Sequence, residues 1–139
     1  MPSSDEDSKS VWPEYYPSDL VVPPLDAVEA SGTFFRLVKS LPPSAKCFTS
    51  THEDQPKKHL RCNSLEEREA VYGTTFWSNK DSLARLKEAL AEAFKDRIMA
   101  TGKLSPAMGK MKKTLEEHHY TVWLKKESNV HVVFSEVKE

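Results

Sequence analysis

Two groups of polar side chains in this sequence have the types and positions needed to bind a small ligand. Thr74, Thr75 and Ser78 come directly before a predicted helix, where hydroxyls, backbone amides and the helix dipole can hold a phosphate. Arg36 lies in an apolar segment, where a guanidinium requires a carboxylate or an anionic ligand as its partner. The alternatives are helix capping for the hydroxyls and a structural ion pair for Arg36.

Histidines supply the candidate acid–base groups. His118 and His119 are adjacent in a predicted strand, so their side chains should point to opposite faces, and one of them could act as an acid or base near neutral pH. His52 and His59 complete no spacing typical of a zinc site, and His131 is expected to be structural or exposed. No metal site is predicted.

The composition is typical of one globular domain. The chain has 139 residues, of which 29% are charged and 38% hydrophobic. A net charge of -1 argues against nucleic acid as a partner, although Lys110, Lys112 and Lys113 form a local basic cluster. No apolar run approaches the roughly 20 residues of a membrane span, and the N-terminus lacks a signal-peptide pattern, so a cytoplasmic protein is predicted.

The two cysteines indicate the redox compartment. Cys47 and Cys62 lack the two-residue spacing of a zinc knuckle or a redox pair. Two free thiols in a reducing compartment are predicted, and a single disulfide is the alternative.

The first 32 residues are predicted to precede the main domain. Residues 1–10 are rich in Ser, Asp and Lys and are expected to form a disordered tail. Residues 11–32 form a proline-rich N-terminal arm, in which Pro13, Pro17 and the pair Pro23-Pro24 exclude a regular helix. The aromatic residues of the arm should dock on the domain, while a linear segment for a protein partner is the alternative.

Residues 33–139 are predicted to form a single domain. Thr33 to Lys39 favour a strand buried on both faces, and Ala45 to Ser50 favour a second short strand. Residues 51–63 are predicted to be an exposed loop. Ser64 and Glu67 form a capping box, which predicts a short helix from Leu65 to about Val71.

The stretch from residue 72 to residue 95 has the clearest pattern. Tyr72 to Trp77 has the β-branched and aromatic content of a strand, and Ser78 or Asn79 can cap a helix behind it. Apolar residues then recur at three- and four-residue spacing, which predicts one principal helix over residues 80–95, packed on a sheet. These residues are Leu83, Leu86, Leu90 and Phe94.

The C-terminal part predicts a helix and a hairpin. Residues 97–101 fit a strand or the last turns of the preceding helix, before Gly102 as a cap or turn. Residues 106–116 are predicted to be a helix, although Gly109 weakens that pattern. Residues 119–124 and 130–137 are predicted strands of an antiparallel hairpin. The fold class is therefore α+β, with a mostly antiparallel, twisted sheet of five or six strands.

Four landmarks over about residues 33–137 resemble a small bacterial family. They are Phe35-Arg36-Leu37-Val38, Pro42-Pro43 leading to Phe48-x-Ser50, Gly73-Thr74-Thr75-Phe76, and His118-His119-Tyr120-Thr121-Val122-Trp123. The chain departs from the family at Cys47, Thr75 and His118, where the family tends to have Asp, Ser and Gly. The resemblance implies one compact domain with grouped polar positions and implies no particular reaction.

A looser resemblance is to ADP-ribosyltransferase and RES-type NAD-consuming folds. Those folds place an Arg on the first strand, a Tyr or Ser/Thr strand before a helix, and an acidic residue late in the chain. Here Arg36, Tyr72 with Thr74 and Thr75, and Glu136 occupy these places in order. The paired acidic motif of those folds is absent, because Val and Lys follow Glu136.

Two function classes follow. The first is a small ligand-binding domain that handles NAD or a nucleotide, like an ADP-ribosyltransferase. Arg36 would engage a phosphate, Tyr72 and Trp77 would stack on a ring, Thr74 and Thr75 would hold or orient the ligand, and His119 or Glu136 would act on the reacting centre. The alternative is a non-enzymatic protein-interaction module, for example of a toxin or defence system, with the arm in the interface. Whether the protein is an enzyme is left open.

Overall fold

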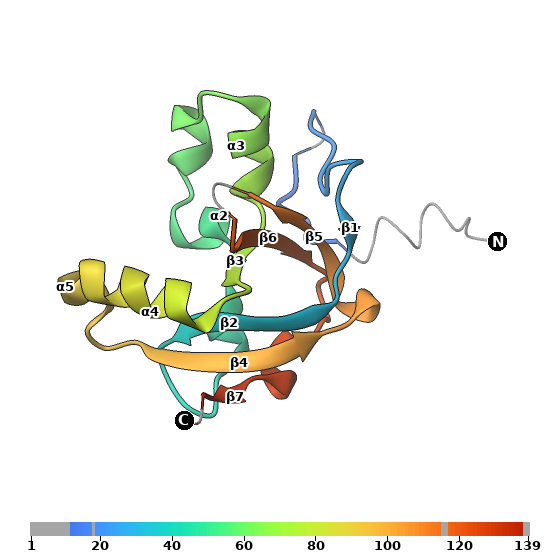
Figure 1. The fold of residues 1–139 in the computed structure, drawn as a ribbon. Coiled ribbons are helices and arrows are strands. Elements are labelled where there is room, and N and C mark those ends of the chain that lie inside the picture. The colour runs from blue at the N-terminus through green and yellow to red at the C-terminus, as the bar shows by residue number, and fades with distance from the viewer. Residues whose placement is uncertain (1–11, 18, 115–116, 138–139) are drawn as a thin grey trace.

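The computed structural model describes residues 12–17, 19–114 and 117–137. These residues form an antiparallel sheet of seven strands, with short helices at one end and along one face (Figure 1). The predicted α+β class is confirmed, with seven strands in place of the predicted five or six. The predicted tail of residues 1–10 lies outside the described residues.

The strands lie in the order β1-β5-β6-β3-β2-β4-β7, and each neighbouring pair is antiparallel. The two edge strands, β1 and β7, have two residues each, and such short edges discourage pairing with another chain. The strands are β1 Val28–Glu29, β2 Gly32–Val38, β3 Thr74–Trp77, β4 Ile98–Leu104, β5 Gly109–Lys113, β6 His119–Leu124 and β7 Ser135–Glu136.

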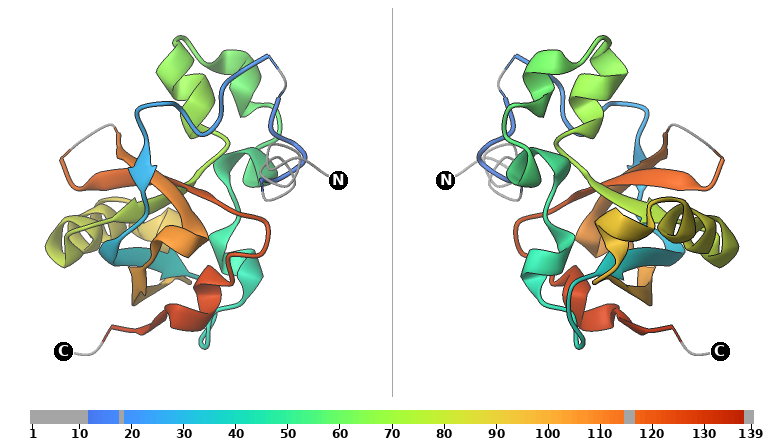
Figure 2. Two further views of the ribbon diagram at one scale, coloured as in Figure 1. Left: turned by 90° about the vertical axis from the view of Figure 1, so that its right-hand side faces the viewer. Right: turned by 90° about the vertical axis from the view of Figure 1, so that its left-hand side faces the viewer.

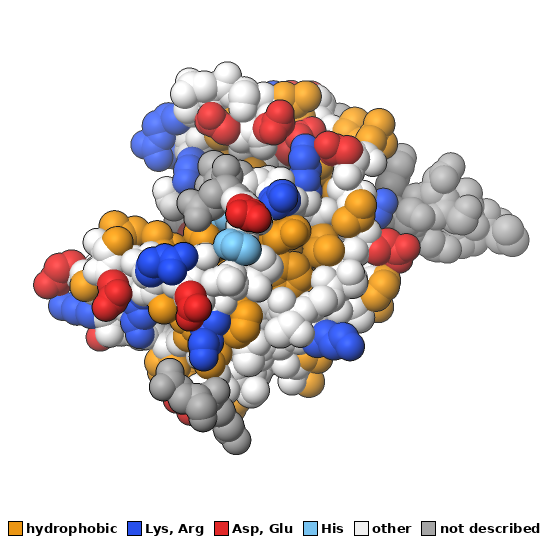
Figure 3. Space-filling model, viewed as in Figure 1, with side chains coloured by type: hydrophobic (Ala, Val, Ile, Leu, Met, Phe, Trp, Pro, Cys, Tyr) orange, Lys and Arg blue, Asp and Glu red, His pale blue; other side chains and the backbone are white. Residues whose placement is uncertain are grey.

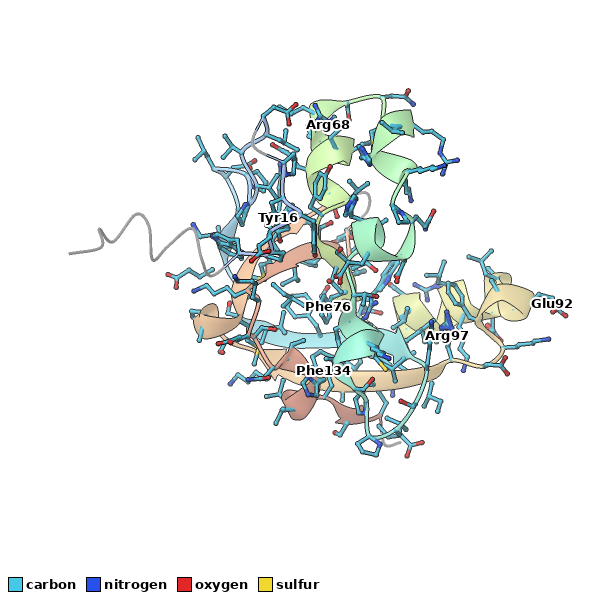
Figure 4. The ribbon with its side chains drawn as sticks, turned by 180° about the vertical axis from the view of Figure 1, so that it is seen from behind. Tyr16, Arg68, Phe76, Glu92, Arg97 and Phe134 are labelled. Carbon is cyan, nitrogen blue, oxygen red and sulfur yellow. The ribbon has the colours of Figure 1, made fainter. Side chains whose placement is uncertain are left out.

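One face of the sheet carries the main hydrophobic core. Phe34 of β2, Phe76 of β3 and Val122 of β6 belong to this core, because strand pairing and the two-residue period place them on one face. Phe48 and Phe134 close the core from outside the sheet, and the ring centroid of Phe134 lies 5.7 Å from that of Phe76 (Figure 4). Each large buried side chain stabilises the fold by about 1.5 to 3 kcal/mol.

The predicted principal helix is shorter than expected. α4 (Lys80–Ala89) begins where the Asn79 side chain accepts a hydrogen bond from the backbone of Ser82, and it packs on β2 and β3 through buried Leu83. The helix breaks at Leu90, whose backbone leaves the helical region, and α5 (Ala91–Phe94) follows. Leu90 is 47% exposed, so the apolar stripe is not buried along its full length, and the prediction of one helix over 80–95 was wrong there.

Three short helices replace the strand and loop predicted between residues 45 and 63. They are η1 Ala45–Phe48, α2 Thr51–Asp54 and η2 Lys58–Arg61, and α3 Leu65–Ala70 follows where a short helix was predicted. α2 was missed, although its capping box of Ser50 and Glu53 is a local signal, because the helix has only one turn. The Ser64 cap of α3 is confirmed, since its hydroxyl accepts a hydrogen bond from the Glu67 backbone at 3.1 Å. Residues 51–70 lie at one end of the sheet (Figures 1 and 2), and we refer to them as the helical segment.

The C-terminal predictions were partly wrong. Residues 106–113 form η3 (Pro106–Met108) and β5 where a helix was expected, while residues 115–116 lie outside the described part. Gly102 is within β4 and is no cap. Residues 130–137 form η4 (Val130–Val133) and β7, and β7 pairs with β4. The predicted hairpin is excluded because β3 and β5 already occupy both edges of β6.

The N-terminal arm docks on the domain, as its aromatic content predicts. Trp12, Tyr15 and Tyr16 pack against a second cluster that includes Tyr72 and Trp123. The Lys125 ammonium lies 6.0 Å from the centroid of the Trp12 ring. β1 falls within the residues predicted to be arm and joins the sheet beside β5.

Candidate functional site

The pairing of β3 with β6 brings three predicted site residues, Thr75, Trp77 and His119, to one face of the sheet, although buried Trp77 does not line the cleft described below. In this ladder Thr75 is opposite Thr121, and Trp77 is opposite His119. Paired residues share a face of the sheet, so these four side chains lie on the face opposite the main core. Thr75 and His119 are far apart in the sequence, so the sequence alone did not indicate that they share a face of the sheet.

A cleft of about 610 Å³ lies between this face and the helical segment. Thr75 and His119 both line it, so the structure places one predicted ligand-orienting residue and one predicted acid–base residue in the same cleft. Its other lining residues are Thr51, Lys58, Cys62, Ser64, Glu66, Glu67, Ala70, Val71, Thr114 and Thr121. We refer to it as the β3–β6 cleft.

A chain of hydrogen bonds orients His119. Nδ1 of His119 lies 2.9 Å from Oγ1 of Thr114, which in turn lies 2.8 Å from Oγ1 of Thr121. The Trp77 ring meets the imidazole edge to face, with centroids 5.1 Å apart. Because hydroxyls both donate and accept, either neutral tautomer of His119 can be accommodated by rotating the two hydroxyl protons. The imidazole is therefore held in one orientation while it can still exchange a proton.

Arg36 supports the cleft from behind. Its Nη1 donates to the backbone carbonyl of Thr75 at 2.7 Å, and its Nε donates to the carbonyl of Cys47 at 2.8 Å. The guanidinium lies beside the stacked rings of Phe48 and Phe76, 5.8 and 5.7 Å from their centroids. Burial lowers the pKa of Arg36 to about 10, so the group stays charged at neutral pH. The sequence predicted a carboxylate or an anionic ligand as the partner of Arg36, whereas these hydrogen bonds go to protein carbonyls.

Tyr72 and Thr74 lie away from the β3–β6 cleft. Both are buried, and Thr74 donates its hydroxyl proton to the carbonyl of Phe48 at 3.0 Å. The ring of Tyr72 is packed among Tyr15, Tyr16 and two histidines. The structure therefore separates these two predicted ligand-binding residues from Thr75 and His119.

Glu136 is also separated from His119. It lies on β7, with β3, β2 and β4 between β7 and β6. Four strand spacings amount to roughly 19 Å, which is too far for both residues to act on one reacting centre. Glu136 is exposed at the sheet edge and has no place in the β3–β6 cleft.

The hydroxyls before α4 serve the helix and its surroundings. Asn79, and not Ser78, supplies the side-chain cap, because Oδ1 of Asn79 accepts from the Ser82 backbone at 2.9 Å. Ser78 is instead 3.3 Å from Nδ1 of His118. The predicted phosphate cradle of Thr74, Thr75 and Ser78 is thus divided between two faces and a turn.

Several lining residues were missed by sequence reasoning. Thr114 fell inside a predicted helix and Thr121 inside an ordinary strand pattern, so neither gave a signal of a site. Cys62 is a free thiol, like Cys47, as predicted. Burial, followed by the charge of Glu67, raises the pKa of Cys62, so it is a protonated thiol at neutral pH and a poor nucleophile.

The described side chains on the face seen in Figure 3 carry charges of both signs. Figure 3 shows acidic and basic side chains interspersed over the helical segment and over α4 and α5. Within the part of the chain that the structure describes, no three His, Cys, Asp or Glu residues are grouped to hold a metal ion. No helix among those residues has the length and apolar character needed to cross a bilayer.

Comparisons with known proteins give no family for the chain. No protein-family model, no curated protein and no solved structure matches it. The two resemblances seen in the sequence therefore stay predictions. Function has to be inferred from the cleft itself.

Proposed function

We propose that the protein binds a ribose-bearing ligand of the mononucleotide or NAD class in the β3–β6 cleft, with His119 as its acid–base group. One observation supports this most directly. Thr75 and His119, each selected from the sequence for a different chemical role, line the same cleft on neighbouring strands. A volume of about 610 Å³ is within the usual range for small-molecule sites.

The lining favours a ligand rich in hydroxyls. Five of the lining side chains carry a hydroxyl: Thr51, Ser64, Thr75, Thr114 and Thr121. A hydroxyl both donates and accepts, so such a wall matches the alternating donors and acceptors of a ribose. Lys58 supplies a cation for a phosphate, while Glu66 and Glu67 can accept from sugar hydroxyls.

The chemistry available to the bound ligand is proton transfer. His119 is 7% exposed, with its ring fixed by Thr114 and Trp77. An imidazole can take up or release a proton near neutral pH, and a fixed ring does so without first being ordered. His119 would therefore act on a ligand hydroxyl or on a water that attacks the ligand.

Calorimetric titration of the full chain with NAD, AMP and ribose 5-phosphate tests the proposal. We expect saturable binding of at least one of them. Thr75→Val should weaken this binding about tenfold or more, because it removes one hydrogen-bonding group from the lining of the β3–β6 cleft. Thr33→Val is the matched control, because Thr33 is exposed on β2 and lies outside the cleft. Absence of binding at millimolar concentrations of all three ligands would refute the proposal.

A second pair of variants tests the histidine. His119→Gln should weaken binding and abolish any turnover of the bound ligand, whereas His118→Gln should leave both unchanged. His118 is the adjacent residue and contacts Ser78 outside the cleft. Equal effects of the two substitutions would exclude a specific role for His119.

Exposed apolar side chains near β1 favour the second candidate, a protein-interaction module. Leu25 is 92% exposed, and Val21 and Val28 are each 58% exposed. The aromatic residues of the arm pack on the domain instead, so these aliphatic side chains would form the interface. Light scattering of the protein with and without Leu25→Asp tests this: an assembly larger than a monomer that the substitution dissociates would support an interface here.

A further inference from the structure

A second cleft, of about 720 Å³, lies between the N-terminal arm and the turn that leads from β6 to η4. Strand β3 contributes Thr74 to the lining of this second cleft and Thr75 to the lining of the β3–β6 cleft. Adjacent residues of a strand point to opposite faces, so the two clefts lie on different sides of the sheet. The proposed function leaves this second space, which we call the arm cleft, unused.

Four aromatic rings form one part of the wall of the arm cleft. Tyr15 and Tyr16 come from the arm, Phe48 from η1, and Tyr72 from the turn before β3. Tyr15 meets Tyr16 edge to face at 5.4 Å and lies parallel to Tyr72 at 6.4 Å between centroids. Figure 4 marks Tyr16 where the arm crosses the sheet. Such walls suit a planar ring, which binds aromatic neighbours by offset stacking and edge contacts.

A carboxylate that lines the arm cleft is held by hydrogen bonds. Oε1 of Glu53 accepts from the Tyr15 hydroxyl at 3.2 Å and from the backbone of Ser50 at 3.0 Å. Burial raises the pKa of Tyr15 to about 12, so its hydroxyl keeps the proton that it donates. Glu53 itself is exposed and still has lone pairs for a second donor, such as a ligand ammonium.

Two cations also line the arm cleft. Lys125 and Lys126 both line the arm cleft from the β6–η4 turn. Lys126 lies 3.7 Å from the carboxylate of Glu14, while the described neighbour of the Lys125 ammonium is the face of Trp12. Lys125 can therefore bind an anionic group without first breaking an ion pair that the structure describes.

We infer that the arm cleft binds a free aromatic α-amino acid. Its ring would pack against the half-buried rings of Tyr15 and Tyr16, its ammonium against Glu53, and its carboxylate against Lys125. Two lining carboxylates, Glu14 and Glu53, balance the two lining ammonium groups. A zwitterion satisfies both signs at once, whereas a ligand of one sign would meet like charge on one side.

Titration of the unmodified full chain with three related indoles tests this inference. L-Tryptophan carries both head groups, tryptamine lacks the carboxylate, and indole-3-propionate lacks the ammonium. We expect saturable binding of L-tryptophan and affinities about tenfold or more weaker for the other two, as for the loss of one hydrogen bond to a charged group. Equal affinities for all three, or no saturable binding of L-tryptophan at millimolar concentration, would overturn the inference.

Charge-neutralising variants then locate the ligand. Glu53→Gln keeps the capping geometry of α2, because Gln also occupies this capping position, and Lys125→Gln removes the charge while leaving a polar side chain. Each should weaken L-tryptophan binding about tenfold. The exposed ion pair of Glu92 and Lys95 provides matched controls. Glu92→Gln and Lys95→Gln should leave the affinity for L-tryptophan unchanged. Binding that is instead lost in His119→Gln would place the amino acid in the β3–β6 cleft and overturn the assignment.

Discussion

Arg36 donates two hydrogen bonds to Thr75, one to its backbone carbonyl at 2.7 Å and one to its hydroxyl at 3.2 Å. The backbone pairing between β2 and β3 is limited to Phe35 opposite Trp77, so the guanidinium supplies hydrogen bonds where the two strands diverge. The side chain that lines the cleft is thereby held in place by a cation from the neighbouring strand.

Replacement of Arg36 by Leu should destabilise the fold. The carbonyls of Cys47 and Thr75 would lose their charged donor, and we expect the free energy of unfolding to fall by about 3 kcal/mol. Urea denaturation measures this loss. Arg85→Leu on the exposed face of α4 is the matched control and should change stability by less than about 0.5 kcal/mol. A wild-type midpoint for Arg36→Leu would contradict the structural role.

Acid should weaken the contact between the arm and the domain through His52. Its ring contacts the rings of Tyr15 and Tyr72, with centroid distances of 5.2 and 5.0 Å, and its Nδ1 is buried with no hydrogen-bond partner among the described residues. Burial, and then the neighbouring His59, lower the pKa of His52 below its ordinary value of 6.5, while Glu53 opposes this. Folding therefore favours the neutral ring, and its contribution is present above pH 6.5 and lost as the pH falls through the lowered pKa.

The pH dependence of the free energy of unfolding measures this effect. His52→Phe keeps an aromatic ring in contact with the two tyrosines and removes the titrating group, so it should lose less stability than the wild type between about pH 7 and about pH 5. His131→Phe, outside this aromatic cluster, should follow the wild type. If the free energy of unfolding changes with pH in the same way in the wild type and in His52→Phe, His52 is not the source of the loss of stability in acid.

The two cysteines should titrate at different pH values. Burial alone would raise the pKa of the Cys47 thiol, but hydrogen bonds from the backbone at Ser44 and Lys39 and from the hydroxyls of Ser40 and Ser44 lower it to about 7. The thiolate absorbance of Cys62→Ser should therefore rise near neutral pH, and that of Cys47→Ser only at higher pH. Ser44→Ala should shift the Cys47 transition upward. Thiolate absorbance that rises at the same pH in both single-cysteine variants would contradict the predicted difference between Cys47 and Cys62.

Local patterns predicted the elements whose signals lie within a few residues. The strands at Thr33 to Lys39, Tyr72 to Trp77 and residues 119–124 and the cap at Ser64 are all present, because β-branched content and capping are properties of neighbouring residues. The site was predicted only in part, since Thr75 and His119 meet through pairing between distant strands. Pairing of this kind depends on the whole sheet and is not encoded at either residue.

The errors arose where tertiary contacts override local preference. Residues 106–116 have helical spacing of apolar residues, yet Gly109 and the residues after it extend the sheet beside β6. Residues 130–137 have strong strand content, but Asn129 adopts a left-handed conformation and begins η4, and no edge of β6 remains open. In both segments the conformation is decided by the pairing positions that remain open in the sheet, and not by the local sequence preference.

Gly109 should be the glycine least tolerant of substitution by alanine. Its φ of 154° is one that residues with a side chain rarely adopt, and a β-carbon would collide with the backbone carbonyl of Trp123. Gly109→Ala should therefore combine backbone strain with displacement of β6, and we expect a loss of about 3 kcal/mol or more in unfolding free energy. Gly32→Ala is the matched comparison, because φ is 97° there while the nearest atom to a β-carbon, in Phe34, lies 3.8 Å away. Strain alone should cost Gly32→Ala about 1 to 2 kcal/mol, so equal losses in urea denaturation would show that the contact with Trp123 contributes nothing.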